Sequence, residues 1–282
     1  MAYVTRDEMI AVFRDTESFC KTDENLKQAI EDSIKGTVFY GAKVYPMLPK
    51  PRFKKTTISV VKRRSLDAAI SMQRKHLELK IAVHNFASAT NPGGGVKHGS
   101  RAQEESICRC TTLYPVLNTD ENWKHFYTVN RERGSSLYDD ACIYTPEIVV
   151  CKSDIDKPAR LPRDKWDLVD VITIAAPDLR DKSDVHVPLV NGGTYMNNAE
   201  LFGYHVKRAI HMLTCAAAKG ADILVLGAFG CGAFQNDPEV VARAYKTALL
   251  EFPKVFKQIE FAVYCPPGGS RNYEVFKRVL LG

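Results

Sequence analysis

The sequence predicts an α/β fold, in which a sheet carries helices on both faces and a helical extension precedes it. Two observations lead to this prediction. From residue 56 onward, short runs of β-branched and apolar residues alternate with longer segments in which apolar residues recur every three or four positions. The runs 168–177 and 221–229 are almost continuously apolar, as is typical of strands that are buried on both faces.

The N-terminal residues predict two helices followed by a loop. Apolar residues occur at helical spacing in 5–20 and in 24–37, and acidic residues lie early in both segments. Segment 45–55 has three prolines and four basic residues, which favour a loop. We therefore expect a helical extension over residues 1–55 and one core domain over residues 56–282.

The core domain is expected to alternate strands and helices. The predicted strands are 56–62, 80–87, 142–152 (one strand or two), 168–177, 221–229 and 259–265. The predicted helices are 65–76, 102–117, 198–220, 237–252 and 272–281. A serine at the start of the first of these helices and a proline in the first turn of the fourth are typical helix-start residues. The sequence has no internal repeat and no clear linker, which favours a single core.

Composition narrows the classes of function. The 282 residues are 45% hydrophobic and 26% charged, which is ordinary for a globular chain. The net charge of +6 suits an anionic ligand but is too small to predict nucleic-acid binding. The first residues are too polar for a signal peptide, and no apolar run approaches the length of a membrane span. The eight cysteines include no C-x-x-C pair, so we expect free buried thiols, no metal site and a reducing, cytoplasmic setting.

Two loops follow predicted strands at the edge where α/β sheets bind ligands. The second of them, residues 226–240, holds Gly227, Gly230 and Gly232 between a strand and a helix. Its backbone N–H groups can hold a diphosphate, and the ring of Phe234 can stack on a sugar or a base. The alternative is a tight turn with the phenylalanine in the core. The loop alone does not decide between a ligand-binding loop and such a turn. It matches neither a dinucleotide fingerprint nor a Walker loop.

The first loop places three glycines close to two carboxylates. Gly93, Gly94 and Gly95 are followed, after seven residues, by Gln103-Glu104-Glu105. The simpler interpretation is that the two glutamates are there because acidic residues at the start of a helix interact favourably with the helix dipole. Because consecutive helix residues point about 100° apart, the two glutamates are expected to serve two neighbouring groups of a ligand, unless the helix start is irregular. One would accept hydrogen bonds from sugar hydroxyls, and the other would act as the acid of a glycosidic cleavage.

Together the two loops resemble the macrodomain family and, more closely, the microbial type of poly(ADP-ribose) glycohydrolase. The signature of that type is three glycines, a short spacer and Gln-Glu-Glu, as here. Residues 85–95, 143–150, 170–180 and 227–242 also resemble family segments. The resemblance implies a macrodomain-like mixed sheet that binds ADP-ribose in a cleft. It also implies hydrolysis of the ribose–ribose bond at the end of a poly(ADP-ribose) chain, without metal or cofactor.

The resemblance also implies roles for individual residues. Glu105 would protonate the leaving ribose oxygen, and Glu104 would hold ribose hydroxyls. The glycines of the first loop would pack against the distal ribose and the diphosphate, and Phe234 against the distal ribose. The other implied binding residues are Asn85, Asn91 and Gln103 near the first loop, and Gly230, Cys231, Gly232 and Ala233, whose N–H groups would face the diphosphate. Many macrodomains have a second asparagine where this chain has Ser88.

Two other functions remain open at this point. One is a reader module that binds ADP-ribose without turnover, and the other is a hydrolase that removes single ADP-ribosyl groups from proteins. The expected partners are ADP-ribose and poly(ADP-ribose), including polymer attached to proteins. We expect no membrane partner, no direct nucleic-acid binding and a monomer. His98, in the spacer, is either a ligand contact or a solvated loop residue.

Overall fold

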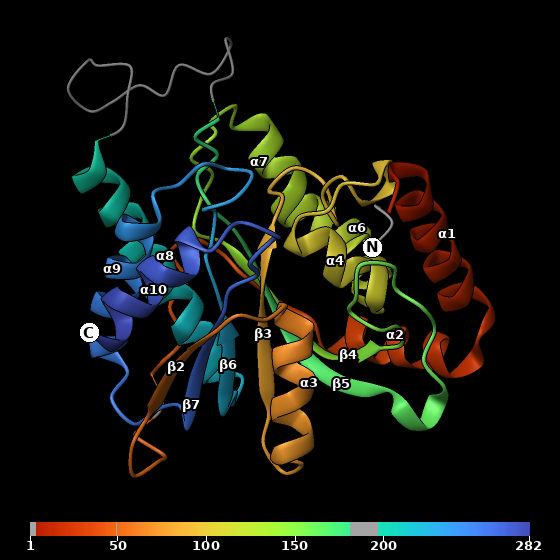
Figure 1. The fold of residues 1–282 in the computed structure, drawn as a ribbon, viewed down its shortest axis with the longest axis horizontal. Helices are drawn as coiled ribbons and strands as arrows, with labels where there is room; N and C mark the ends of the chain where they lie inside the picture. Colours follow the sequence, from red (N-terminus) through yellow and green to blue (C-terminus); the bar gives the residue numbers. More distant parts are fainter. Residues whose placement is uncertain (1–3, 49, 181–196) are drawn as a thin grey trace.

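The computed structural model describes residues 4–48, 50–180 and 197–282, and Figure 1 shows their arrangement. Their strands form one seven-stranded mixed sheet in the order β1-β4-β5-β3-β6-β7-β2. Neighbouring strands from β5 to β2 are parallel, whereas β4 is antiparallel to both β1 and β5. The strands are β1 (Val38–Tyr40), β2 (Thr57–Val61), β3 (Ile81–Ala87), β4 (Cys142–Val150), β5 (Asp167–Ala175), β6 (Ile223–Leu226) and β7 (Gln258–Ala262). The predicted α/β fold with a mixed sheet is confirmed.

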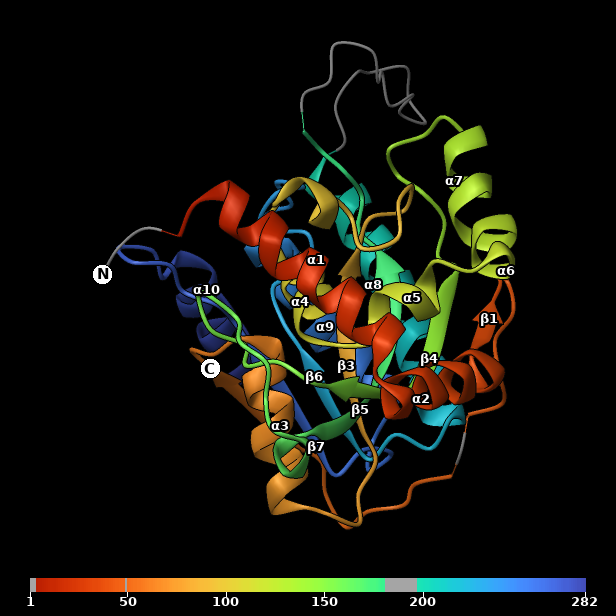
Figure 2. The ribbon, with the colours of Figure 1, turned by 90° about the vertical axis from the view of Figure 1, so that its right-hand side faces the viewer.

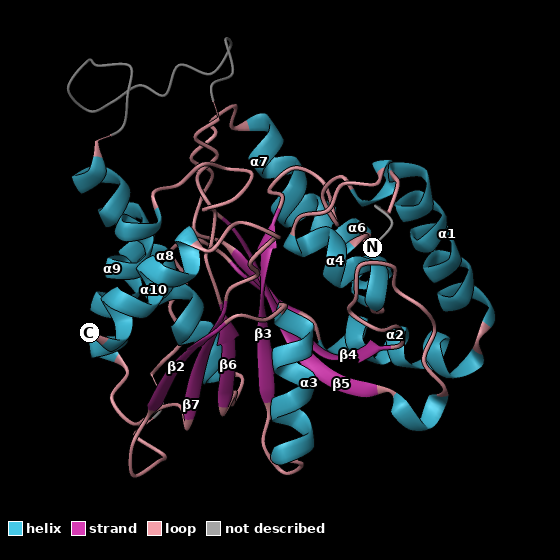
Figure 3. Ribbon diagram, in the orientation of Figure 1, coloured by secondary structure: helices cyan, strands magenta, loops and turns pink. Residues whose placement is uncertain are grey.

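Helices cover both faces of this sheet, as Figure 3 shows. One face packs against α8 (Asn198–Ala218), α9 (Pro238–Ala248) and α10 (Arg271–Leu281), and the other against α3 (Ser65–Lys75), α4 (Gln103–Cys110) and α5 (Leu113–Leu117). Along β3, Ala82 belongs to the first core and Val83 to the second, because successive side chains of a strand point to opposite faces. No helix among the described residues is long and apolar enough to cross a membrane.

The predicted helix over 102–117 is wrong, because the segment forms two helices. Between α4 and α5, Thr111 makes an isolated bridge to Val150 of β4. Pro115 has no backbone N–H and would interrupt the hydrogen bonds inside one continuous helix. The break places it in the first turn of α5, where that missing N–H costs nothing. Strand β1 and the helical segments α6 (Asp120–Asn122), η2 (Trp123–Tyr127) and α7 (Thr128–Glu132) were not predicted.

The two N-terminal helices pack closely on the core. Helix α1 (Arg6–Thr22) lies over α4 in Figure 2, and α2 (Glu24–Gly36) contacts β4. Arg6 Nε donates to the carbonyl of His98 at 2.6 Å, so α1 also contacts the glycine loop. The segment that follows α2 supplies β1, whose Tyr40 pairs with Cys142. The boundary between an extension and a core at residue 55 stays a prediction.

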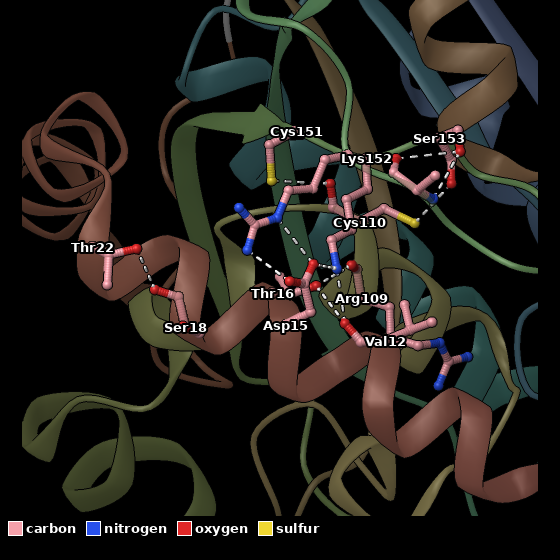
Figure 4. Close-up of polar contacts among 12 residues, drawn as sticks. Val12, Asp15, Thr16, Ser18, Thr22, Arg109, Cys110, Cys151, Lys152 and Ser153 are labelled. Carbon is pink, nitrogen blue, oxygen red and sulfur yellow. Dashed lines mark hydrogen bonds and ion pairs between the residues drawn. The ribbon is translucent and has the colours of Figure 1, made fainter.

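The end of α4 is held by groups from α1 and from the segment after β4 (Figure 4). The last carbonyls of a helix have no partner within it. Here Thr16 Oγ1 donates to the carbonyl of Arg109 at 2.6 Å, and the N–H groups of Cys151 and Lys152 both donate to the carbonyl of Cys110. The ammonium of Lys152 is buried between Asp15 Oδ2, at 2.7 Å, and the carbonyl of Val12, at 2.8 Å. The helix that carries both glutamates is therefore fixed at its far end.

Candidate active site

A cleft of about 1210 Å³ runs along the edge of the sheet where the parallel strands end. Its walls come from residues that directly follow β3, β5, β6 and β7, together with the start of α4. In open α/β sheets this edge is where ligands bind. Both glycine loops predicted from the sequence line this cleft.

Gln103 attaches the start of α4 to the central strand β3. Its Oε1 accepts from the N–H of Phe86 at 2.9 Å, and its Nε2 donates to the carbonyl of His84 at 2.7 Å. The side-chain amide thus bonds to β3 in the way that a neighbouring strand would. Nε2 also donates to Ser65 Oγ at 3.0 Å. These bonds fix the position of the helix turn from which both glutamates project.

Glu104 is 2% exposed and both of its oxygens are engaged. Oε2 accepts from the N–H of Ser88 at 2.7 Å, and Oε1 accepts from Asn85 Nδ2 at 3.2 Å. Burial raises the pKa of Glu104 to about 8, although the donors at Ser88 and Asn85 oppose this shift. Burial, reinforced by the neighbouring Glu105 carboxyl, therefore favours the uncharged form of Glu104.

Glu105 is held through one oxygen only. Its Oε1 accepts from the N–H of Gly95 at 2.9 Å, whereas the buried Oε2 has no hydrogen-bond partner among the described residues. Gly94 lies against both carboxyl groups: a Cβ there would come within 2.6 Å of Glu105 Oε1 and 3.0 Å of Glu104 Oε2. The two side chains thus converge on one glycine, although the angle between consecutive helix residues predicted separate directions. Flexible side chains and a bare backbone at Gly94 allow this convergence.

The second loop is held in shape by Asn236, which is 2% exposed. Its Nδ2 donates to the carbonyls of Pro177, Gly230 and Phe234, and its Oδ1 contacts Nε2 of His205 at 2.8 Å. Gly230 has a φ of 74°, which favours glycine, and a Cβ there would meet the Asn236 side chain. The loop therefore has a defined shape at the mouth of the cleft.

The structure brings most of the predicted binding residues together. Those that line the cleft are Asn91, Gly94, Gly95, Gln103, Glu104, Glu105, Gly230, Gly232, Ala233 and Phe234, and His98 also lines it. Asn85, Gly93 and Cys231 do not line the cleft. Asn85 is fully buried and also bonds to Thr173 Oγ1, and the N–H of Cys231 is already bonded to the carbonyl of Ala228.

Residues 7–153, slightly more than half of the chain, match the family described as microbial-type PARG, catalytic domain. The chain belongs to this family. No curated protein sequence matches it.

Solved structures of poly(ADP-ribose) glycohydrolases are similar to this PARG-family chain over nearly its whole length. One is the glycohydrolase from Thermomonospora curvata, with 28% identity, a TM-score of 0.84 and coverage of 97% of this chain and 99% of that one. The same enzyme bound to the inhibitor ADP-HPD matches with 28% identity, a TM-score of 0.79 and coverage of 96% and 99%. The Deinococcus radiodurans enzyme in complex with ADP-ribose has 29% identity, a TM-score of 0.75 and coverage of 89% and 96%.

Further residues that the sequence analysis missed line the cleft of this PARG-family domain. At one side the guanidinium of Arg180 lies 5.1 Å from the ring centre of Phe234. At the far end, beyond β7, the guanidinium of Arg64 lies 4.6 Å from the ring centre of Tyr264, whose side chain is half exposed. A flat ring with a cation above it can also stack on a base. No local sequence pattern marks Tyr264, because Arg64 reaches it from another strand end.

The cleft itself gathers no group of three metal-binding side chains among the described residues. One such group exists elsewhere in the described part of the PARG-family chain, and it consists of Cys142, His211 and Cys215. None of these three residues lines the cleft.

Proposed function

We propose that this chain is a poly(ADP-ribose) glycohydrolase, which hydrolyses the ribose–ribose O-glycosidic bond and releases ADP-ribose. The observation that carries the proposal is the convergence of two buried carboxyl groups on Gly94 inside a cleft of suitable size. Glycosidic cleavage needs an acid for the leaving oxygen, and the substrate supplies diphosphates that backbone N–H groups can hold.

In the proposed mechanism the two glutamates have different roles. Glu105 is the general acid that protonates the leaving ribose oxygen: its side chain lines the cleft, and its Oε2 has no hydrogen-bond partner among the described residues. Glu104 has both oxygens engaged and positions the scissile bond through ribose hydroxyls. Asn85 acts through Glu104 and is a positioning residue.

The other predicted residues that line the cleft form the binding surface of the proposed site. The backbone of Gly94 and Gly95 packs against the distal ribose, and that of Gly230, Gly232 and Ala233 faces the diphosphate. Phe234, backed by Arg180, packs on the distal ribose. In this proposal residues 56–282 form the catalytic core, and residues 1–55 brace the glycine loop and α4.

We further propose a monomer that acts on free and protein-attached polymer and does not bind nucleic acid directly. A reducing compartment such as the cytoplasm is supported by the eight cysteines, all of which are free thiols.

The test measures release of ADP-ribose from labelled poly(ADP-ribose). Wild type should release it, and Glu105→Gln should lower kcat by about 10²–10⁴-fold while retaining ADP-ribose binding. Glu251 is exposed and does not line the cleft, so Glu251→Gln is the matched control and should remain fully active. A wild type that binds ADP-ribose but leaves polymer intact would be a reader. Faster removal of single ADP-ribosyl groups from proteins would make it a mono-ADP-ribosyl hydrolase.

A further inference from the structure

Three metal-binding side chains meet on the face of the sheet that packs against α8. His211 and Cys215 lie one turn apart on α8, so they point to the same side. Cys142 is the first residue of β4 and belongs to the same core cluster as Cys215. One ligand atom from each residue lies within 4.8 Å of the other two, and all three residues are buried.

Each ring nitrogen of His211 faces a carbonyl oxygen, so in the neutral ring one nitrogen has no proton to donate. Nδ1 lies against the carbonyl oxygen of Asp140, and Nε2 lies 2.9 Å from the carbonyl oxygen of Val44. A neutral imidazole has one N–H and one lone pair, so it can donate to only one of these carbonyls. The other nitrogen would be satisfied either by a second proton, which it could donate, or by a metal ion bound to its lone pair. A histidine that binds metal through one nitrogen and donates to a backbone carbonyl through the other is a common arrangement.

The charges around this group are compatible with a cation. The carboxylate of Asp140 is already paired with Arg208 Nε at 3.0 Å and Lys207 Nζ at 2.7 Å, so it does not compete for the metal. Two cysteine thiolates balance the charge of a divalent ion, and a buried site of zero net charge avoids the cost of an unpaired buried charge. Thiolate sulfur and imidazole nitrogen are also ligands that Zn²⁺ prefers.

We propose that Cys142, His211 and Cys215 bind a Zn²⁺ ion in a structural site. Binding replaces the two thiol protons, and one nitrogen of His211 ligates the metal while the other keeps its carbonyl. A tetrahedral ion needs a fourth ligand, which water or the carbonyl of Val44 would supply. The ion would hold together β4, α8 and the segment after β1. This role is independent of the proposed hydrolase activity.

The first experiment measures zinc in chain that has been loaded with Zn²⁺ and dialysed against metal-free buffer. Wild type is expected to retain about one zinc ion per chain, and Cys215→Ser less than about a tenth of that. Cys20→Ser is the matched control, because Cys20 is also buried but lies on α1, outside the group. This variant should retain as much zinc as wild type. Loss of zinc in both variants, or in neither, would overturn the proposal.

A second experiment needs only the wild-type chain, in case Cys215→Ser does not fold. Co²⁺ added to metal-free protein should give a sulfur-to-cobalt charge-transfer band that saturates at about one ion per chain, and added Zn²⁺ should remove it. No such band would refute the site. A Cys142–Cys215 disulfide in peptides of freshly isolated, unreduced protein would also refute it, because the two residues would then form a redox pair.

Discussion

Gly94 and Glu105 are in direct contact: a Cβ on the glycine would lie 2.6 Å from Oε1 of the glutamate. Gly94 also has a φ of 56°, a conformation that favours glycine. We therefore expect Gly94→Ala to displace the carboxylate and lower kcat/KM for polymer by on the order of 10²-fold, because small shifts of a catalytic group have large effects on rate. Release of ADP-ribose from labelled polymer measures this change.

Gly134→Ala is the matched control for backbone strain. Gly134 has a φ of 63°, but in the described part of the chain no atom beyond its two sequence neighbours lies within 4 Å of its Cβ position. Both substitutions should lower the free energy of unfolding by roughly 1–2 kcal/mol from the left-handed backbone alone. Only Gly94→Ala should lose turnover. Equal losses of turnover in the two variants would show that strain, and not contact with Glu105, is responsible.

The raised pKa of Glu104 makes a prediction about stability and pH. Burial raises this pKa from 4.5 to about 8, so between these values the folded chain binds a proton that the unfolded chain has released. The contribution of Glu104 to stability is thus fully present below about pH 4.5 and is lost as the pH rises through about 8. The total loss is about 5 kcal/mol for a shift from 4.5 to about 8, since each pKa unit corresponds to 1.36 kcal/mol.

Glu104→Gln isolates this effect, because its amide cannot ionise. The free energy of unfolding of wild type should fall relative to that of Glu104→Gln as the pH rises from 5 to 9. Denaturant unfolding at several pH values measures the difference. A constant difference across this range would mean that the pKa of Glu104 is not raised.

The order of strands and helices could be predicted because it depends on local patterns. Continuous apolar runs identified β5 and β6, and helical spacing identified α8. Strand β1 was missed because its three residues carry no periodicity, and it is defined by pairing with β4, far along the chain. The break between α4 and α5 depends likewise on the bridge from Thr111 to a distant strand.

The candidate site could be predicted where its residues are close in sequence. The three glycines and the two glutamates belong to one strand–loop–helix unit, so their pattern was visible. Asn236 and Tyr264 were missed because their roles come from contacts between separate strand ends. The spacing of Cys142 from Cys215 also matches no local metal motif, and only the packing of α8 on the sheet brings them together.

Tyr264 is predicted to stack on the base of ADP-ribose at the end of the cleft. Stacking of one base on an aromatic ring contributes about 1–3 kcal/mol. Tyr264→Leu should therefore weaken ADP-ribose binding by roughly 10-fold or more, and it should leave binding of ribose 5-phosphate, which has no base, unchanged. Calorimetric titration with both ligands measures this.

Tyr273→Leu serves as the control for Tyr264. Tyr273 also has a cation over its ring, Lys62 Nζ at 4.5 Å from the ring centre, but it lies on α10 and does not line the cleft. Its substitution should not change either affinity. If Tyr264→Leu weakens the binding of ADP-ribose and of ribose 5-phosphate equally, the ring does not contact the base.

Thr16 is predicted to stabilise the helix that carries both glutamates. Its hydroxyl is buried and donates to the carbonyl of Arg109 in the last turn of α4, at 2.6 Å. Valine has the same shape but cannot donate, so Thr16→Val leaves a buried carbonyl without this partner and should cost about 1–3 kcal/mol of stability. Amide hydrogen exchange along α4 should become faster than in wild type.

Thr22 provides a comparison on the same helix, because its exposed hydroxyl bonds to the carbonyl of Ser18 one turn earlier and not to α4. Figure 4 shows both threonines. Thr22→Val should change stability by less than about 0.5 kcal/mol, as is usual for surface substitutions, and should leave exchange in α4 unaltered. Both variants lose a hydroxyl, so the difference between their free energies of unfolding measures what the bond from Thr16 to α4 contributes. If both variants lose the same stability and exchange in α4 does not change, then α1 does not brace the glutamate helix through Thr16.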